Sequence, residues 1–268
     1  TTSSPTSVGE RLTKGYTVML NYAVIKRENV LWSVNATLRH LASEYRDVSR
    51  YLDKFNADNK SKNMLRYYDG GSPSDLWAVR SAGIDAITGR EIFIRKDGSQ
   101  TFTHSYDDEV VVGNSDPDFE GVIGTSFYYK GFSISANFRY RVGGQIFLST
   151  LYEKVENISV DDAHYNQDKR ALYDRWKQPG DNAKFKAISI TDETPMSSRF
   201  VADNNVFSGE SISMGYESQG KWLRTIGASS FYVRVYMNDI FRVSTVKNER
   251  GIDYPFARSV SMSLGLRF

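Results

Sequence analysis

The last nine residues of the chain alternate strictly between apolar and small or polar side chains. Val260, Met262, Leu264, Leu266 and Phe268 are apolar, and every residue between them is Ser, Gly or Arg. Successive side chains of a β-strand point to opposite faces of a sheet, so this period of two predicts a strand with one apolar face. A chain that repeats the pattern many times is expected to fold as an all-β protein.

The same alternation recurs upstream and predicts seven strands. Trp32, Val34, Ala36 and Leu38 form one such row, with polar residues between them. The predicted strands are 15–25, 31–41, 119–129, 132–142, 209–217, 229–243 and 256–268. We expect them to be antiparallel strands of a single sheet.

One turn fixes the register of two predicted strands. Lys130-Gly131 separates 119–129 from 132–142, and a two-residue hairpin places its flanking residues opposite each other on the same face. These are Tyr129 and Phe132, which both lie on apolar rows. The turn and the alternation therefore predict the same pairing.

The connections between the predicted strands are alternately short and long. The short turns are 26–30, 130–131 and 218–228, and the long loops are 42–118, 143–208 and 244–255. Bacterial outer-membrane barrels have short periplasmic turns and long extracellular loops, so this asymmetry favours a transmembrane antiparallel β-barrel. A soluble β-sandwich alternates as well and is the alternative on pattern alone.

Composition excludes several other classes of protein. The mean hydropathy of -0.47 is too polar for a bundle of transmembrane helices. Basic and acidic residues number 34 and 32, so there is no basic field that would favour nucleic acid as a partner. Cys is absent, and no Ser/His/Asp set or His-x-x-x-His pair stands out. We therefore expect neither an enzyme nor a cofactor or metal site.

Five blocks of residues follow one another through the loops and strand entries. They are Ala82-Gly83-Ile84-Asp85 with Thr88-Gly89; Gly113-Asn114 with Pro117 and Phe119; Asp174-Arg175-Trp176 with Pro179-Gly180-Asp181; Ser198-Arg199-Phe200-Val201; and Tyr254-Pro255 with Arg258. In this order they resemble the blocks AGVD-x-x-TG, GN-x-x-P-x-F, DRW-x-x-PGD, S-x-R-F-V and YP-x-x-R of the SusC/RagA family of TonB-linked outer-membrane proteins, which is common in Bacteroidetes. Five blocks in order are a specific signal, although one block alone would be weak.

The resemblance implies a plugged barrel of 22 strands in the bacterial outer membrane. Residues 1–268 would be the C-terminal portion of that single barrel domain, in contact with outer-membrane lipid, and the plug and the TonB-contacting segment would belong to the rest of the transporter. The implied function is TonB-dependent import of a glycan or peptide nutrient with a SusD-like surface lipoprotein. A passive pore, an adhesin or a structural barrel component without TonB coupling is the alternative.

The polar rows supply candidates for the lumen of such a barrel. They are Asn137, Arg139, Arg141, Arg234 and Tyr236. We expect them to face inward, and we expect lipid to meet the even-numbered residues of 15–25, 31–41, 132–142, 209–217 and 256–268. Arg139 and Arg141 would pair with the plug or with Glu120, or else steer an anionic or hydroxyl-rich cargo.

The long loops contain further candidates. Tyr67, Tyr68 and Trp77 would either stack on sugar rings outside the cell or pack their loop on itself. Residues 166–176 are predicted to be helical, ending before Pro179-Gly180. Residues 114–120 alternate oxygen-bearing side chains but lack the Gly and terminal Glu of an EF-hand loop, so a strand entry is favoured over a calcium site.

The end of the chain is a candidate assembly signal. Leu264, Leu266 and Phe268 form an alternating apolar end that would lie at the periplasmic interface, where aromatic side chains are favoured. The family resemblance implies that the outer-membrane insertion machinery reads this end.

Overall fold

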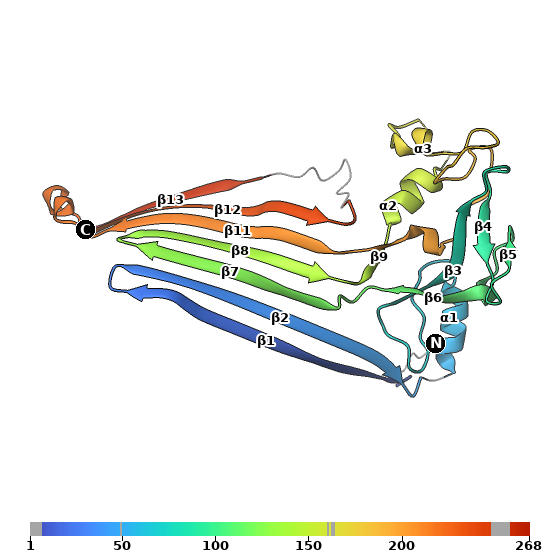
Figure 1. The fold of residues 1–268 in the computed structure, drawn as a ribbon, viewed down its shortest axis with the longest axis horizontal. Coiled ribbons are helices and arrows are strands. Elements are labelled where there is room, and N and C mark those ends of the chain that lie inside the picture. Colours follow the sequence, from blue (N-terminus) through green and yellow to red (C-terminus); the bar gives the residue numbers. More distant parts are fainter. Residues whose placement is uncertain (1–6, 49, 160, 162–163, 248–257) are drawn as a thin grey trace, which may run out of the picture. The chain divides into compact units, whose positions relative to one another are not determined.

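The computed structural model describes residues 7–48, 50–159, 161, 164–247 and 258–268 (Figure 1). The chain divides into two compact units. The sheet unit contains residues 15–41, 117–143 and 204–268, and the loop unit contains residues 1–14, 42–116 and 144–203. Among the described residues, no helix is both long and apolar enough to cross a membrane.

Seven strands form one sheet in the order β1-β2-β7-β8-β11-β12-β13 (Figure 1). Their bounds are β1 Glu10–Arg27, β2 Val30–Arg46, β7 Phe119–Tyr129, β8 Phe132–Val142, β11 Val206–Ser218, β12 Ser230–Ser244 and β13 Val260–Arg267. From β2 to β13 each neighbouring pair is antiparallel. The prediction of one sheet is confirmed, and the 11 residues of β7 and of β8 match the about 9–11 that a transmembrane strand needs.

The strand ends differ from the predicted ones where the pattern weakens. β1 begins five residues before the predicted 15, β2 continues to Arg46 instead of 41, and β11 begins at Val206 instead of 209. Of the last predicted strand, residues 256–257 lie outside the described residues, as does the Tyr254-Pro255 block. Polar residues of β1 and β2 continue the ladder beyond the apolar rows, so alternation alone could not find these ends.

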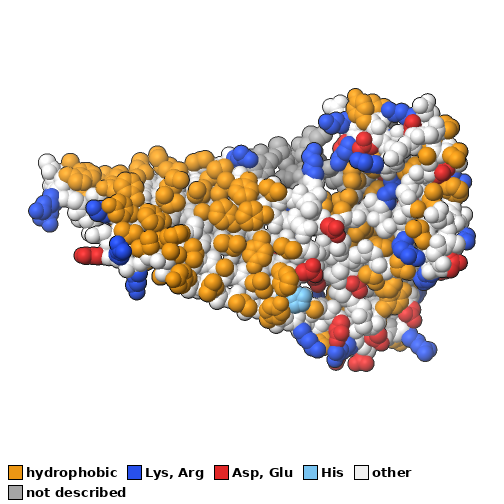
Figure 2. All heavy atoms as spheres, viewed as in Figure 1, with side chains coloured by type: hydrophobic (Ala, Val, Ile, Leu, Met, Phe, Trp, Pro, Cys, Tyr) orange, Lys and Arg blue, Asp and Glu red, His pale blue; other side chains and the backbone are white. Residues whose placement is uncertain are grey.

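The register places an apolar row directly beside a polar row. Paired residues of an antiparallel ladder share a face. One row crosses six strands as Trp32, Phe127, Ile134, Met214, Val235 and Met262, and the next row crosses the same strands as Ser33, Ser126, Ser135, Ser213, Tyr236 and Ser261. The sheet therefore has one apolar face and one polar face. Figure 2 shows the hydrophobic side chains gathered over the strands on the visible side.

The β7–β8 hairpin has the turn that the sequence predicts. Lys130 has φ 44° and Gly131 has φ 92°, both positive as a type I′ turn requires. Tyr129 pairs with Phe132 directly across the turn. Gly131 is needed for a second reason, because a Cβ atom there would lie 2.3 Å from the carbonyl oxygen of Glu217.

A β-bulge interrupts β11 between Gly209 and Ser211. Relative to β8 the extra residue is Glu210, whereas β12 places two residues, Asp239 and Ile240, opposite it. On the neighbouring β12, Asp239 has φ 50°, at the point where the apolar alternation loses its phase. Beyond it, Phe241 returns to the apolar row and pairs with Gly209. The bulge thus restores the two-faced pattern toward the long-loop end.

The loop unit has sheets of its own. A four-stranded sheet has the order β5-β4-β3-β6, and β9 pairs with β10. The strands are β3 Asp75–Ile84, β4 Glu91–Ile94, β5 Gln100–Thr101, β6 Glu109–Asn114, β9 Gln145–Phe147 and β10 Val201–Asp203. Strands β3 and β4 form an antiparallel hairpin around Asp85 and Thr88. The other strands were not predicted, because they are short and lack a sustained alternation.

Short helices complete the described part of the chain. They are α1 Tyr51–Asn59, η1 Tyr106–Asp108, α2 Ser149–Leu151, the π-helix η2 Tyr152–Glu156, α3 Arg170–Tyr173, η3 Ser198–Phe200 and, in the sheet unit, η4 Lys221–Ile226. The predicted helix over 166–176 is wrong in extent. It ends at Tyr173 because Arg175 leaves the helical path and forms a β-bridge with Phe185.

The strand entry at 113–119 is confirmed. The Asn114 amide donates to Asp75 Oδ1 at 2.8 Å, and Asn114 Oδ1 accepts from the backbone N–H of Asp116 at 2.8 Å. The Asn114 side chain is therefore used to close a turn, and β7 begins at Phe119 as predicted. No group of three His, Asp or Glu side chains that could hold a metal occurs among the described residues.

Candidate functional site

The five lumen candidates lie on one face of the sheet. Arg139 pairs in register with Ser208 and Arg234 pairs with Gly215, on the polar side of β11. The Asn137 amide donates to Ser211 Oγ at 3.1 Å, and Tyr236 pairs with Ser213. Arg141 lies opposite Glu120. The register thus brings the five together on the serine-rich face, and their exposure to a barrel lumen stays a prediction.

The ion pair of Arg139 on the polar face differs from the expected one. Arg139 Nε lies 3.3 Å from Glu210 Oε1, the carboxylate that the bulge adds to this face. Glu120, the partner proposed for Arg139 and Arg141, lies 3.6 Å from Arg39 Nη1. Glu210 was not expected as a partner, because the alternation of apolar and polar residues does not reveal the bulge that turns its side chain toward Arg139.

Positive charge exceeds negative charge on the polar face. The paired residues of this face include the arginines 39, 139, 141, 234, 242 and 267 and the glutamates 120 and 217, and the unpaired Glu210 adds a third carboxylate beside Arg139. Near the short-turn end, Arg234 lines a shallow hollow of about 360 Å³ together with the serines 126, 133, 135 and 213 and with Leu31, Phe127, Tyr128 and Ile134. Such a surface is suited to a hydroxyl-rich or anionic contact and not to lipid.

The aromatic candidates of the first long loop are divided between two ring clusters. Tyr67 packs against Tyr45 and Phe55, with ring centroids 5.3 and 5.4 Å apart. Tyr68 packs against Trp77 at 5.0 Å. These contacts support the packing alternative, because the three rings do not form one open platform for a sugar.

The candidate assembly signal lies at the end of the edge strand β13. Leu264 and Leu266 pair with Val233 and Phe231 on the apolar face, and Phe268 follows the strand with 81% of its surface exposed. Recognition of this end by insertion machinery stays a prediction. Substitution of the three residues with Ser is expected to deplete the protein from outer membranes without reducing its synthesis.

A buried ionic cluster joins the two long loops. We call Glu91, Glu156, Arg175, Lys186 and Arg199 the loop clamp. Arg199 Nη2 lies 2.9 Å from Glu91 Oε2 and 2.7 Å from Glu156 Oε1, and the side chain of Glu156 is fully buried. Glu91 begins β4 in the first loop, whereas Glu156 and Arg199 belong to the second.

Hydroxyl groups donate further hydrogen bonds to the two clamp carboxylates, Glu91 and Glu156. Ser197 Oγ donates to Glu91 Oε1 at 2.5 Å, and Thr194 Oγ1 donates to Glu156 Oε1 at 2.9 Å. Burial opposes the charge of Arg199, but the hydrogen bonds and negative charges of Glu91 and Glu156 outweigh that effect and raise its pKa. The guanidinium of Arg199 is therefore firmly ionised.

The other two clamp cations bind mainly neutral oxygens. Arg175 Nε donates to Ala171 O at 2.9 Å and Nη1 donates to Lys186 O at 3.0 Å, while Nη2 donates to Val155 O. Lys186 Nζ donates to Asn157 Oδ1 at 3.3 Å. Burial lowers the pKa of both Arg175 and Lys186, and the charge of Glu156 partly offsets this.

The motif blocks are in direct contact around the clamp. Trp176 Nε1 donates to Ala86 O at 2.9 Å, and the backbone N–H of Gly180 donates to the same oxygen at 2.8 Å. Gly89 has φ +69°, and a Cβ atom there would lie 2.6 Å from the Trp176 ring. The Asp174-Arg175-Trp176 block thus packs against the turn of the β3–β4 hairpin and donates a hydrogen bond to it. Sequence reasoning missed Glu91, Glu156 and Lys186. The sequence offers one indication of a role for Glu91 and Lys186, which is that they lie close to motif blocks, and it offers none for Glu156.

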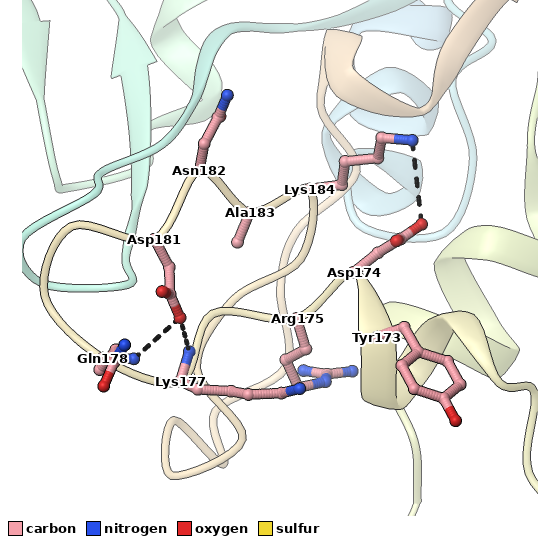
Figure 3. A pocket seen from close by; sticks show the side chains of 9 residues that line it. All are labelled: Tyr173, Asp174, Arg175, Lys177, Gln178, Asp181, Asn182, Ala183 and Lys184. Carbon is pink, nitrogen blue, oxygen red and sulfur yellow. Dashed lines mark hydrogen bonds and ion pairs between the residues drawn. The ribbon is translucent and has the colours of Figure 1, made fainter.

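An open hollow of about 480 Å³ lies inside the segment that follows α3 (Figure 3). Its lining consists of Tyr173, Asp174, Arg175, Lys177, Gln178, Asp181, Asn182, Ala183 and Lys184. Asp181 Oδ2 accepts from the backbone N–H groups of Lys177 and Gln178 at 2.9 and 3.0 Å, which shapes the turn at one end. Lys184 Nζ lies 3.8 Å from Asp174 Oδ2 at the other end.

Comparisons with known proteins agree with the motifs. No family model matches the chain. TonB-dependent receptor P39 of Formosa agariphila is 22% identical over 201 residues, which cover 73% of this chain and 19% of that receptor. TonB-dependent receptor P3 of the same organism is 25% identical over 171 residues, which cover 64% and 16%. The chain spans about a fifth of the length of the curated relatives it matches.

Solved structures of the RagAB peptide transporter share the fold. One matches with a TM-score of 0.71 and 17% identity over 90% of this chain and 27% of that chain. The "open-open" state of the RagAB peptide importer matches with a TM-score of 0.72 and 17% identity over 90% and 26%. The named similar proteins are receptors and transporters, not enzymes. In fold and in its motif blocks the chain is accordingly similar to part of the β-barrel of SusC/RagA-type TonB-dependent receptors, which are proteins of the bacterial outer membrane.

Proposed function

We propose that this chain forms part of the wall of an energised importer. In this proposal a SusD-like surface lipoprotein captures a glycan or peptide outside the cell, and TonB acts on a plug carried by the rest of the transporter. The sheet unit separates lipid from the import path, and the loop unit forms part of the outer surface.

The observation that carries the proposal is the two-faced sheet. Its apolar row runs across six strands without a charged residue, and its polar face carries the arginines. An Arg facing lipid near the bilayer midplane costs about 2–4 kcal/mol, so several arginines on one face favour the lumen for that face. The same logic assigns the apolar face to lipid.

The polar face also suits a removable plug. Its ion pairs are partly exposed, and exposed pairs contribute only about 0–1 kcal/mol each. A protein surface that binds and releases this face would therefore gain or lose little free energy for each ion pair that it replaces. That property is useful in a path that must open and close.

Dependence on energy distinguishes import from a passive pore. Uptake of a labelled peptide and a labelled glycan would be measured in cells that carry the receptor, with and without TonB and with a protonophore. The proposal expects uptake to fall to the level of cells lacking the receptor in both treatments. Uptake that persists without TonB would favour the passive pore.

The lipoprotein partner is tested separately. Affinity purification of the receptor from outer membranes is expected to recover a surface lipoprotein in near-equal amount. A receptor that purifies alone from mild detergent, yet still imports cargo, would contradict the partner and leave the transport function standing.

A further inference from the structure

The segment 173–184 has a rigid frame that does not depend on its exposed side chains. The backbone N–H groups of Lys184 and Phe185 donate to Asp174 O at 2.9 and 3.2 Å and close the neck of the segment. At the far end, the Asp181 carboxylate caps two backbone N–H groups. The frame therefore presents a preformed hollow.

Several polar side chains that line this hollow make no hydrogen bond to another described residue of the chain. Within the described part of the chain, no hydrogen bond uses the side chains of Tyr173, Lys177, Gln178 or Asn182. Tyr173 has 71% of its surface exposed. A phenol ring, an ammonium group and two amides are thus available to a ligand, and Figure 3 shows them around the hollow.

The hollow has an excess of positive charge. Arg175, Lys177 and Lys184 face Asp174 and Asp181, and Asp181 is already occupied by two backbone N–H groups. The guanidinium of Arg175 is buried and hydrogen-bonds only backbone carbonyls, and the nearby charge of Glu156 offsets part of its positive charge, so Lys177 is the cation that a ligand would meet directly. A ligand with a negative charge would meet a favourable potential here.

The polarity of the lining limits the kind of ligand. Sites for apolar groups are lined mostly by apolar side chains, whereas Ala183 is the one aliphatic residue among the nine that line this hollow. An acidic peptide would place its apolar side chains against charged groups. A sugar presents hydroxyl groups to amides on its edges and a flatter apolar face to an aromatic ring.

We propose that the hollow enclosed by residues 173–184 binds a short acidic oligosaccharide at the surface of the receptor. Lys177 attracts the carboxylate, Gln178 and Asn182 donate to hydroxyl groups, and Tyr173 provides a ring face. The volume of about 480 Å³ lies in the range of small-molecule sites, about 300–1,000 Å³. Binding here needs neither TonB nor a lipoprotein, so it does not depend on the proposed import function.

The test is binding to the full receptor purified in detergent. Calorimetric titration would use trisaccharides of galacturonate and of glucuronate, with neutral galactose and glucose trisaccharides as controls. The proposal expects at least one uronate to bind and the neutral sugars to bind about tenfold more weakly or not at all, as befits one lost charge-assisted hydrogen bond. Higher salt should weaken uronate binding.

Three variants locate the site. Lys177→Ala, Asn182→Ala and Tyr173→Ala should each weaken uronate binding, with Lys177→Ala showing about a tenfold loss. Lys54→Ala, an exposed lysine of α1, is the matched control and should bind like the wild type. Heat-dependent gel migration checks that every variant is folded.

Four results would overturn the proposal. They are no binding of either uronate at millimolar concentration, equal binding of neutral and acidic sugars, equal affinity of Lys177→Ala and Lys54→Ala, and tighter binding of an acidic tripeptide. Each of these is obtained without an uptake assay, so failure here is distinct from failure of the import function.

Discussion

The Arg139–Glu210 pair of the sheet unit and the Arg199 pairs of the loop unit lie in opposite environments. In the sheet unit, the side chain of Arg139 is 59% exposed beside Glu210. In the loop unit, the side chain of Arg199 is 12% exposed and that of Glu156 is fully buried. The first kind of pair contributes about 0–1 kcal/mol, whereas removing one partner of the second kind costs about 3–5 kcal/mol.

This difference shows what holds each unit together. The sheet unit depends on its backbone ladder and its apolar face, in which no single side chain is decisive. The loop unit has small apolar clusters, such as Val155, Ala171 and Phe185, and relies on a few buried charges from distant parts of the chain. Single substitutions should therefore have larger and more local effects in the loop unit.

The largest effect is expected from Arg199→Ala. It leaves Glu91 and Glu156 buried without their cation, which should destabilise the loop unit by about 3–5 kcal/mol. Limited proteolysis of the receptor in outer membranes should then cut within residues 42–116 or 144–203. The matched control is Arg139→Ala, which should leave the cleavage pattern unchanged. Equal patterns for both variants would mean that the clamp does not hold the loops.

The next effect concerns the two faces of the sheet. Met214→Arg puts a charge on the apolar row and should cost about 2–4 kcal/mol. Ser213→Arg, one position away on the polar face, should be tolerated. Urea unfolding in lipid vesicles measures both. A greater loss for Ser213→Arg than for Met214→Arg would reverse the assignment of the faces.

A smaller effect is expected where the two motif blocks meet. Gly89→Ala combines a positive φ with a clash against Trp176, whereas Gly98→Ala has a positive φ of +88° and open space around it. A left-handed conformation costs a non-Gly residue about 1–2 kcal/mol, so the control should lose only that amount. The proteolysis midpoint of the loop unit should fall further for Gly89→Ala. An identical shift would show that the Trp176 contact is unimportant.

The smallest effect is a dependence on alkaline pH. Burial, followed by the negative charge of Glu193, raises the pKa of Tyr152 above its ordinary value of 10.0. The folded loop unit therefore keeps a proton that the unfolded chain loses above pH 10, and stability falls as pH rises beyond that point. Tyr152→Phe should remove this part of the dependence and cost about 1 kcal/mol at neutral pH through the lost hydrogen bond to Glu193. Proteolysis between pH 8 and 11 provides the measurement, and an unchanged pH profile in the variant would contradict it.

The same contrast explains what the sequence predicts and what it does not. The strands and their register follow from local alternation and from the Lys130-Gly131 turn. Both signals lie within short stretches of consecutive residues. The bulge at Glu210 breaks that period, so the alternation points to the plug or Glu120, and not to Glu210, as the partner of Arg139. The clamp joins Arg199 to Glu91 across 108 positions, a separation at which no local pattern operates.

The helix predicted over 166–176 failed for a related reason. Leu172 and Trp176 are spaced as on one helical face, but Trp176 donates to the distant Ala86 carbonyl, and Leu172 is 61% exposed. Tertiary contacts of the motif block override the local helical preference. The family blocks identified the region without revealing that its residues hold the loops together.

The assignment of the two faces is tested most directly by their contact with lipid and water. The 268 residues contain no Cys, so single Cys substitutions at Met214, Val235, Ser213 and Tyr236 add unique labelling sites to this part of the receptor. Spin labels there would be measured in lipid vesicles for collisions with oxygen, which concentrates in lipid, and with a water-soluble nickel complex. The account predicts that labels at 214 and 235 respond mainly to oxygen, and that labels at 213 and 236 do not. Oxygen-dominated relaxation at 213 and 236, with nickel-dominated relaxation at 214 and 235, would contradict it.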